Sequence, residues 1–310
     1  MGKIAFVFPG QGAQAVGMGL DAWETSPEAR KVFEQADEAL GFKLTDLVFN
    51  GPDDQLKQTY NTQPALLTVS SAYLAALQAK GVRADFVAGH SLGEYSALVA
   101  AGVLPFTDAV RTVRRRGELM EAAVPSGQGA MAAVLGAERE ALADLCREVT
   151  QAGTAVELAN VNCPGQIVIS GTKEGVQAVQ ERGKEIGAKR VLPLEVSGPF
   201  HSSLMRPAAD KLADELAKLN LQAPVVPVIA NVTAEPVTDP EKIRSLLVEQ
   251  VYSPVLWEDS ITRLIEAGVD TFVEIGSGSV LTGLIRKIDR NVRVVTVNSM
   301  EAVNHYSESN

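Results

Sequence analysis

The segment Gly89-His90-Ser91-Leu92-Gly93 has the residue types and spacing of a nucleophile elbow, a turn that exposes a serine hydroxyl for attack on a carbonyl carbon. A strand-like run at 85–88 precedes it and a helical pattern follows it, as such a turn requires. The amides at the start of that helix point at the serine oxygen. We therefore predict that Ser91 is a nucleophile and that the backbone N–H of Leu92 is an oxyanion donor. The alternative is a glycine-bounded turn around an ordinary serine.

A serine hydroxyl needs a base, and the chain has three histidines. His90 is a poor partner because neighbouring side chains at an elbow point apart, and His305 lies in a polar tail that we expect to be frayed. His201 precedes a helical pattern at 203–219, and a helix N-terminus keeps an imidazole neutral, as a general base must be. We predict His201 as the base; the alternative is a loop histidine that satisfies backbone groups. No acid follows a core strand between the serine and this histidine, which favours a dyad over a triad.

The loop after the first strand contains Gly10, Gly12 and Ala15 at the spacing of a dinucleotide-binding loop. That fold requires a second strand ending in an acid about twenty residues further on. The chain at 27–40 has a helical period instead, which excludes the dinucleotide interpretation. In an acyl-transfer enzyme the same loop could supply a second oxyanion donor, the backbone N–H of Gln11. Otherwise Gln11 is an ordinary polar loop residue.

A helical pattern at 108–123 carries three consecutive arginines. Arg115 points nearly opposite the apolar stripe and belongs to solvent. Arg114 and Arg116 flank the stripe, and either could reach into the body and hold a carboxylate through two parallel hydrogen bonds. The pattern does not choose between them.

The elements that must position these residues alternate between short β-rich runs and amphipathic helical patterns. This order predicts an α/β fold, with a hydrolase-like body around a mostly parallel central sheet. The middle third has the order βαββαβ, which is the ferredoxin-like arrangement, and glycine and proline mark its ends. We therefore predict a large catalytic body from 1–127 and 198–310, with a small ferredoxin-like subdomain inserted at 128–197.

Composition narrows the classes of function. The 310 residues carry a formal net charge of −10, which disfavours binding to nucleic acid or to an anionic membrane. The longest apolar run, 97–106, is far shorter than the ~20 residues of a membrane-spanning helix. Two cysteines cannot form a disulfide scaffold or a four-cysteine zinc site. With no targeting signal at the start, we expect a cytoplasmic protein, without a metal site and without nucleic-acid or membrane partners.

The chain resembles the malonyl-CoA:acyl carrier protein transacylases of fatty-acid synthesis over essentially its whole length. The resemblance rests on seven motifs in order: Phe8-Pro-Gly-Gln-Gly12, Thr62-Gln-Pro-Ala65, Gly89-His-Ser-Leu-Gly93, Arg116-Gly-Glu-Leu-Met120, Asn162-Cys-Pro-Gly-Gln166, Gly198-Pro-Phe-His201 and Gln250-Val-Tyr-Ser-Pro254. It implies ping-pong transfer of a malonyl group from malonyl-CoA to the phosphopantetheine thiol of acyl carrier protein, through a malonyl-serine and with no metal or prosthetic group.

The resemblance also assigns roles. It implies Ser91 as nucleophile, His201 as base, and the amides of Gln11 and Leu92 as the oxyanion hole. It further implies that Arg116 holds the malonyl carboxylate and that the main-chain carbonyl of Gln250 orients the histidine in place of a triad acid. Phe200, before the histidine, is similar to the residue at this position in malonyl-selective members of the family, whereas methylmalonyl-selective relatives carry serine there. The chain departs from the family at Ser277 and Ser279, where relatives usually have proline and often lysine, which bears on loop rigidity and on one carrier-protein or CoA contact.

Three alternatives remain at this stage. One is a serine thioesterase or hydrolase that uses the same dyad with water as acceptor. Another is a malonyl transferase of a polyketide pathway, and the third is a non-catalytic carrier-binding module. Because carrier proteins are acidic and this chain is negative, docking requires a local basic patch. The candidates for it are Lys189, Arg190, Arg286 and Lys287.

Overall fold

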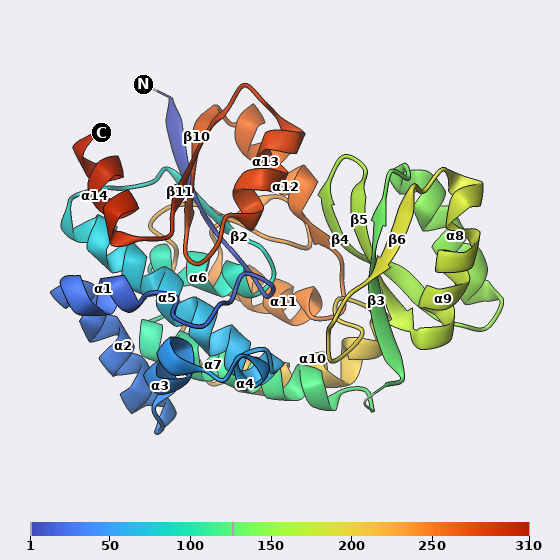
Figure 1. The fold of residues 1–310 in the computed structure, drawn as a ribbon, viewed down its shortest axis with the longest axis horizontal. Helices are drawn as coiled ribbons and strands as arrows, with labels where there is room; N and C mark the ends of the chain where they lie inside the picture. Colours follow the sequence, from blue (N-terminus) through green and yellow to red (C-terminus); the bar gives the residue numbers. More distant parts are fainter. Residues whose placement is uncertain (1, 126, 310) are drawn as a thin grey trace.

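The computed structural model describes residues 2–125 and 127–309, which form a mixed α/β fold with two sheets (Figure 1). The strands are β1 (Lys3–Phe8), β2 (Phe86–Gly89), β3 (Gly129–Leu135), β4 (Val156–Cys163), β5 (Gln166–Thr172), β6 (Arg190–Pro193), β7 (Val228–Ile229), β8 (Pro236–Val237), β9 (Val255–Leu256), β10 (Val269–Ile275) and β11 (Arg293–Val297). The helices are α1 (Leu20–Thr25), α2 (Pro27–Leu40), α3 (Leu44–Asn50), α4 (Asp53–Leu56), α5 (Thr59–Ala79), α6 (Leu92–Ala100), α7 (Phe106–Ala122), α8 (Arg139–Gln151), α9 (Lys173–Arg182), α10 (Arg206–Ala217), α11 (Pro240–Gln250), α12 (Trp257–Glu266), α13 (Val280–Ile288) and α14 (Met300–Glu308), with 3₁₀ turns η1 (Gly183–Ile186) and η2 (Ser203–Met205).

The first sheet has the strand order β11-β10-β1-β2-β7-β8, and its neighbours are parallel except for β7 and β8. Phe8 at the end of β1 is in register with Gly89 at the end of β2. Because the carboxyl ends of parallel strands share one edge, the loops that follow β1, β2 and β7 lie together there. The predicted Gln11 and Ser91 follow two of these strands.

Both faces of this sheet are covered by helices, which is why β1 is apolar at successive positions. Its residues alternate between two cores, as the twofold period of a strand requires. Phe6 and Phe8 pack in a core with residues of α2, α5, α6 and α7, whereas Ala5 and Val7 pack on the opposite face with residues of α12 and α13. The buried sheet therefore gives the loops at its edge a rigid support.

The second sheet has the order β6-β3-β5-β4-β9 and stands beside the first, with α8 and α9 on its outer face (Figure 1). The pairs β3–β5, β3–β6 and β4–β5 are antiparallel. The fifth strand, β9, pairs in parallel with β4 through Asn160 and Val255. It comes from beyond the segment 128–197 that the sequence delimits, so the surrounding chain completes this sheet.

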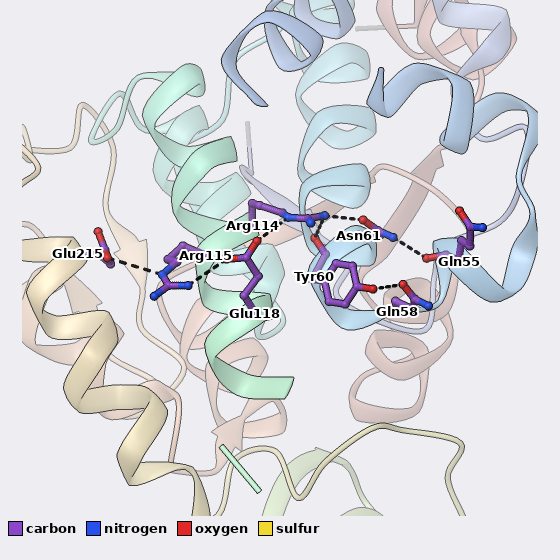
Figure 2. A network of polar contacts seen from close by, with 8 residues as sticks. All are labelled: Gln55, Gln58, Tyr60, Asn61, Arg114, Arg115, Glu118 and Glu215. Carbon is purple, nitrogen blue, oxygen red and sulfur yellow. Dashed lines mark hydrogen bonds and ion pairs between the residues drawn. The ribbon is translucent and has the colours of Figure 1, made fainter. Parts of the chain in front are cut away.

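Helix α5 begins at Thr59 and includes Pro64. Proline has no N–H, so the carbonyl of Tyr60 loses its helical donor. Arg114 of α7 replaces that donor, because its Nη1 donates to the Tyr60 carbonyl oxygen at 3.2 Å (Figure 2). The helix therefore accommodates Pro64 because a side chain from a distant segment replaces the missing hydrogen bond.

The prediction of a frayed tail at 304–310 is wrong for residues 304–308, which belong to α14, and residue 310 lies outside the described residues. The hydroxyl of Ser299 caps this helix by accepting the N–H of Ala302 at 3.1 Å, and Val303 and Tyr306 are buried against the body. His305 is exposed on this helix. Within residues 2–125 and 127–309, no helix is long and apolar enough to cross a membrane.

Candidate active site

Ser91 lies in the sharp turn between β2 and α6, with φ 51° and ψ −108°. This conformation is strained for a residue with a side chain, and such strain is typical of functional turns. Both flanking glycines are sterically required. A Cβ on Gly89 would lie 1.9 Å from the carbonyl carbon of Gly93, and a Cβ on Gly93 would lie 2.1 Å from the carbonyl oxygen of Phe8. The two glycines therefore let the strand, the turn and the helix approach closely enough to form the elbow.

The structure brings Ser91 and His201 together from 110 positions apart, with 2.7 Å between Oγ and Nε2. The other ring nitrogen, Nδ1, lies 2.8 Å from the main-chain carbonyl oxygen of Gln250. A carbonyl can only accept, so Nδ1 carries the proton and Nε2 is left to accept from the serine hydroxyl. This is the tautomer that a general base needs.

His201 is 4% exposed, and its environment keeps the ring neutral. Burial lowers its pKa to about 3, and the positive charge of Arg116 acts in the same direction. The sequence-based reason for a neutral ring was a helix N-terminus. The larger causes in the structure are removal from water and the neighbouring guanidinium.

The two residues predicted as oxyanion donors lie at the sheet edge beside the serine. Gln11 follows β1, Leu92 begins α6, and both line a cavity of about 110 Å³ with Ser91 and His201. The amide of Ser91 itself donates to Oδ1 of Asn231 at 2.8 Å. Among the described residues, no hydrogen bond uses the backbone N–H of Gln11 or of Leu92. These amides are available to a ligand oxygen in the cavity.

The structure separates the two arginines that the helical pattern could not distinguish. Arg116 is 1% exposed and its Nη2 lies 3.2 Å from Oγ of Ser91. The same nitrogen donates to Oε1 of Gln250 at 2.9 Å, and Nη1 donates to Oε1 of Gln63 at 2.7 Å. A buried guanidinium beside the serine can hold a carboxylate on a bound acyl group.

Arg114 and Arg115 have other partners (Figure 2). Arg114 contacts Asn61 and donates from Nε to Glu118 at 2.9 Å. Arg115 pairs with Glu118 at 3.1 Å and with Glu215 of α10 at 3.7 Å. Neither guanidinium belongs to the cavity that contains the serine.

The remaining cavity wall is mainly apolar and is supplied by α7, by β3 and by the chain after β6. Phe200, Met120, Met131, Leu194 and Val196 line it. Asn160 and His90 line it as well and are shared with an adjoining cavity of about 270 Å³, which extends along Asn162, Gln166 and the start of α13. His90 points away from the serine contact, because its Nε2 lies 2.8 Å from Oδ1 of Asn162 and its ring packs near Trp257. The site is therefore a mainly apolar pocket that shares part of its wall with the larger cavity of about 270 Å³.

Sequence reasoning missed three buried polar residues around the serine: Gln63, Glu94 and Asn231. A signal existed for two of them. Glu94 is an acid in the otherwise apolar start of α6, and Gln63 lies within a motif that carried the family resemblance. Burial raises the pKa of Glu94 to about 7. Asn231 follows β7, and only its place at the shared sheet edge reveals it.

For the described part of the chain, no group of three or more His, Cys, Asp or Glu side chains is arranged to hold a metal ion. The chemistry that these residues support is attack by the serine oxygen on an acyl carbon. The imidazole can accept the proton, and the two amides can stabilise the negative oxygen. A guanidinium at this position can pair with a negative charge on the acyl group.

Comparison with known proteins agrees with this chemistry. The sequence model of the family described as acyl transferase domain matches residues 5–305. The malonyl CoA-acyl carrier protein transacylase of Bacillus subtilis strain 168 is 55% identical over 303 residues, which are 98% of this chain and 96% of that protein. The crystal structure of acyl-carrier-protein-S-malonyltransferase from Bartonella henselae superposes with a TM-score of 0.96 at 46% identity, covering 100% of this chain and 99% of the other.

A malonyl-transacylase solved in complex with a type II PKS acyl-carrier protein has the same TM-score, 0.96, at 44% identity, and covers 99% of this chain and 100% of the other. Such agreement in sequence and structure, over nearly the full length of each protein, confirms the family resemblance that the seven motifs indicate. The chain therefore belongs to the acyl transferase domain family, among the malonyl CoA-acyl carrier protein transacylases.

Proposed function

We propose that this protein transfers a malonyl group from malonyl-CoA to the phosphopantetheine thiol of acyl carrier protein through a malonyl-Ser91 intermediate. One observation carries the proposal beyond family membership: Nη2 of Arg116 lies 3.2 Å from the Oγ that also contacts His201. The cation is therefore within reach of a carboxylate on an acyl group bound to that oxygen. A hydrolase of uncharged esters would gain nothing from a buried guanidinium at this position.

In the first half-reaction, Ser91 Oγ attacks the thioester carbon while Nε2 of His201 accepts the hydroxyl proton. The carbonyl oxygen becomes an oxyanion that accepts hydrogen bonds from the amides of Gln11 and Leu92. The carbon–sulfur bond then breaks, and the proton on the imidazole passes to the leaving sulfur of CoA. The carbonyl of Gln250 stabilises the imidazolium that forms between these steps.

The second half-reaction repeats these steps with a different sulfur. The thiol of the carrier's phosphopantetheine arm gives its proton to His201 and attacks the malonyl-serine carbon. The same two amides stabilise the second oxyanion, and the serine oxygen leaves with the proton from the imidazole. Throughout, Arg116 holds the free carboxylate and Phe200 limits the space beside the acyl carbon.

The division of the chain supports the site. We propose that 1–127 and 198–310 form a hydrolase-like catalytic body and that 128–197 form a ferredoxin-like subdomain, supported by the antiparallel strand order β6-β3-β5-β4. The cavities lie between residues of both parts. A cytoplasmic location remains a prediction from the sequence.

Docking of an acidic carrier to a chain of net charge −10 requires local positive charge. Lys189, Arg190, Arg286 and Lys287 are exposed. Lys287 donates to Oε1 of Gln166, a residue that lines the larger cavity, at 3.1 Å. We propose these four residues as the docking patch. Their charge reversal is expected to raise the KM for carrier protein and to leave the KM for malonyl-CoA unchanged.

Intact-mass measurement after mixing with malonyl-CoA tests the function. The native chain is expected to gain one malonyl group, which holo carrier protein then removes, and Ser91→Ala is expected to gain none. A native chain that does not acylate would favour a non-catalytic carrier-binding module. Release of free malonate without carrier protein, at the rate of transfer, would favour a hydrolase. Comparison of carriers from fatty-acid and polyketide synthesis distinguishes the two pathways.

A further inference from the structure

Glu94 is a buried carboxylate that the proposed reaction steps do not use. It lies on α6 one turn after Ser91, and it is 3% exposed. Removing a carboxylate from water is costly unless donors satisfy it. Because Glu94 lies near the serine, the groups that donate to it show which parts of the site it holds in place.

One oxygen of Glu94 accepts two hydrogen bonds from different segments. Oε2 accepts Nε2–H of Gln250 at 2.7 Å and the backbone N–H of Asn231 at 3.2 Å. Gln250 ends α11 and supplies the carbonyl that His201 contacts. Asn231 follows β7, accepts the N–H of Ser91 at 2.8 Å, and donates to the carbonyl of Gly89 at 2.7 Å. Glu94 therefore joins the segments that hold the histidine and the serine turn.

The surroundings of the Gln250 side chain allow only one orientation of its amide. Its Nε2 faces three acceptors: Glu94 Oε2, the Ser91 carbonyl oxygen at 3.0 Å and Asn231 Oδ1 at 3.3 Å. Its Oε1 therefore faces Nη2 of Arg116. The reverse orientation would place an NH₂ group against a guanidinium, which can only donate. Glu94 is the one carboxyl acceptor of the three, and its hydrogen bond, at 2.7 Å, is the shortest of them.

Arg116 depends on this orientation because few groups hold it. Its Nη1 donates to Gln63, and its Nη2 donates to Gln250 and to Oγ of Ser91, while Nε is buried without a partner among the described residues. The ring of Tyr95 lies under the guanidinium, with 5.6 Å from Cζ to the ring centre. If Gln250 no longer presented its oxygen, Gln63 would be the one amide acceptor left. The guanidinium could then rotate over the Tyr95 ring and no longer point toward the serine oxygen.

We propose that Glu94 is a positioning residue that fixes the side-chain amide of Gln250, directs Arg116 toward the acyl carboxylate, and so sets the preference for carboxyl-bearing acyl groups. The inference rests on the proposed malonyl transfer. It places part of the substrate selectivity in a residue that does not touch the substrate.

The test compares kcat/KM for malonyl-CoA and acetyl-CoA as donors to holo carrier protein. Glu94→Ala is expected to lower the malonyl-to-acetyl ratio by about tenfold or more, the size expected for loss of a hydrogen bond to a charged group. Glu94→Gln is expected to keep the ratio within about threefold, because its amide oxygen can accept both hydrogen bonds. Gln250→Leu keeps the main-chain carbonyl and is expected to lower the ratio as Glu94→Ala does.

Asp37 of α2 provides a matched control, since it is a buried carboxylate that accepts two hydrogen bonds from Thr45, at 3.0 and 2.7 Å. Asp37→Ala is expected to lower stability and leave the ratio unchanged. The proposal is overturned if Glu94→Ala or Gln250→Leu keeps the native ratio, or if Glu94→Gln loses it as fully as Glu94→Ala. A native enzyme that transfers no malonyl group would instead overturn the proposed function.

Discussion

Nδ1 of His201 donates to the main-chain carbonyl of Gln250, with 2.8 Å between nitrogen and oxygen, where a catalytic triad would have a carboxylate. A carbonyl fixes the tautomer and the direction of the ring as a carboxylate does, but it brings no full negative charge. The carbonyl therefore supplies no full charge to offset the burial of the ring and the charge of Arg116. Burial and this charge lower the pKa of the ring to about 3.

Removal of this imidazole tests its role as base. His201→Ala is expected to slow acylation of Ser91 by malonyl-CoA by about 10²–10⁴-fold, the usual contribution of a positioned general base. The measurement is the rate of malonyl-enzyme formation in rapid-quench experiments. His305→Ala, on the exposed side of α14, is the control and should acylate at the native rate. An acylation rate within tenfold of native for His201→Ala would contradict the assignment.

The low pKa of His201 also predicts how stability depends on pH. In the unfolded chain the ring has its ordinary pKa near 6.5, so between about 6.5 and 3 the unfolded state binds a proton that the folded state does not. The free energy of unfolding should therefore decrease as the pH falls from 6.5, by roughly 2 kcal/mol at pH 5 from this group alone. Urea unfolding at pH 7 and pH 5 should show a smaller decrease for His201→Gln. Equal decreases in the two proteins would be inconsistent with a buried neutral ring.

The two residues of the Ser91–His201 contact could be predicted from the sequence because their signals are local or rare. The elbow needs only two glycines and a serine between a strand and a helix, and the chain offers just three histidines. The order of strands and helices likewise predicts the α/β class, since each periodicity is a property of a short segment. The ferredoxin-like and hydrolase-like descriptions remain predictions.

The parts that sequence reasoning could not supply all depend on partners from distant segments. Arg114 and Arg116 flank the same apolar stripe, and only the position of Gln63 on α5 and Gln250 on α11 distinguishes them. The continuation of α5 through Pro64 depends on a distant partner in the same way, because Arg114 donates to the Tyr60 carbonyl that Pro64 leaves free. No pattern within one helix contains this information.

Arg116→Ala should reduce malonyl transfer far more than acetyl transfer, because only the malonyl group presents a carboxylate to the guanidinium. The expected drop in the ratio of kcat/KM values is about 10–100-fold, from loss of charge-assisted hydrogen bonds. Arg114→Ala is the control, since its guanidinium is bound to Asn61 and Glu118 outside the cavity. If Arg116→Ala kept the native preference, the carboxylate would have to be held elsewhere.

Two glycine-to-alanine substitutions, one in the elbow and one in α13, should have different effects on stability. A Cβ at Gly93 would lie 2.1 Å from the Phe8 carbonyl oxygen, so Gly93→Ala must displace the strand or the helix. It should lower the free energy of unfolding by about 3 kcal/mol or more and abolish acylation. Gly283 in α13 has open space at the Cβ position, so Gly283→Ala should be neutral or stabilise by about 0.5–1 kcal/mol. Urea unfolding and intact mass measure both effects, and a well-folded, active Gly93→Ala protein would disprove the steric account.

Phe200 controls the size of the acyl group if the wall of the small cavity sets selectivity. Its side chain is 5% exposed, precedes His201, and lines the pocket with Met120 and Met131. Phe200→Ser removes the ring and leaves room beside the acyl carbon for a methyl branch. Methylmalonyl transfer should therefore rise relative to malonyl transfer by about tenfold, since one methyl group is worth ~1–3 kcal/mol in such a pocket.

Competition between malonyl-CoA and methylmalonyl-CoA for one carrier protein, read by intact mass, measures this ratio. Phe42→Ser supplies the matched control, because that ring is 38% exposed and lies outside the cavity that contains Ser91. A selective gain in Phe200→Ser alone would locate the restriction at the aromatic ring, next to His201. An unchanged ratio would instead assign the restriction to the remaining wall, which includes the large side chains of Met120, Met131 and Leu194.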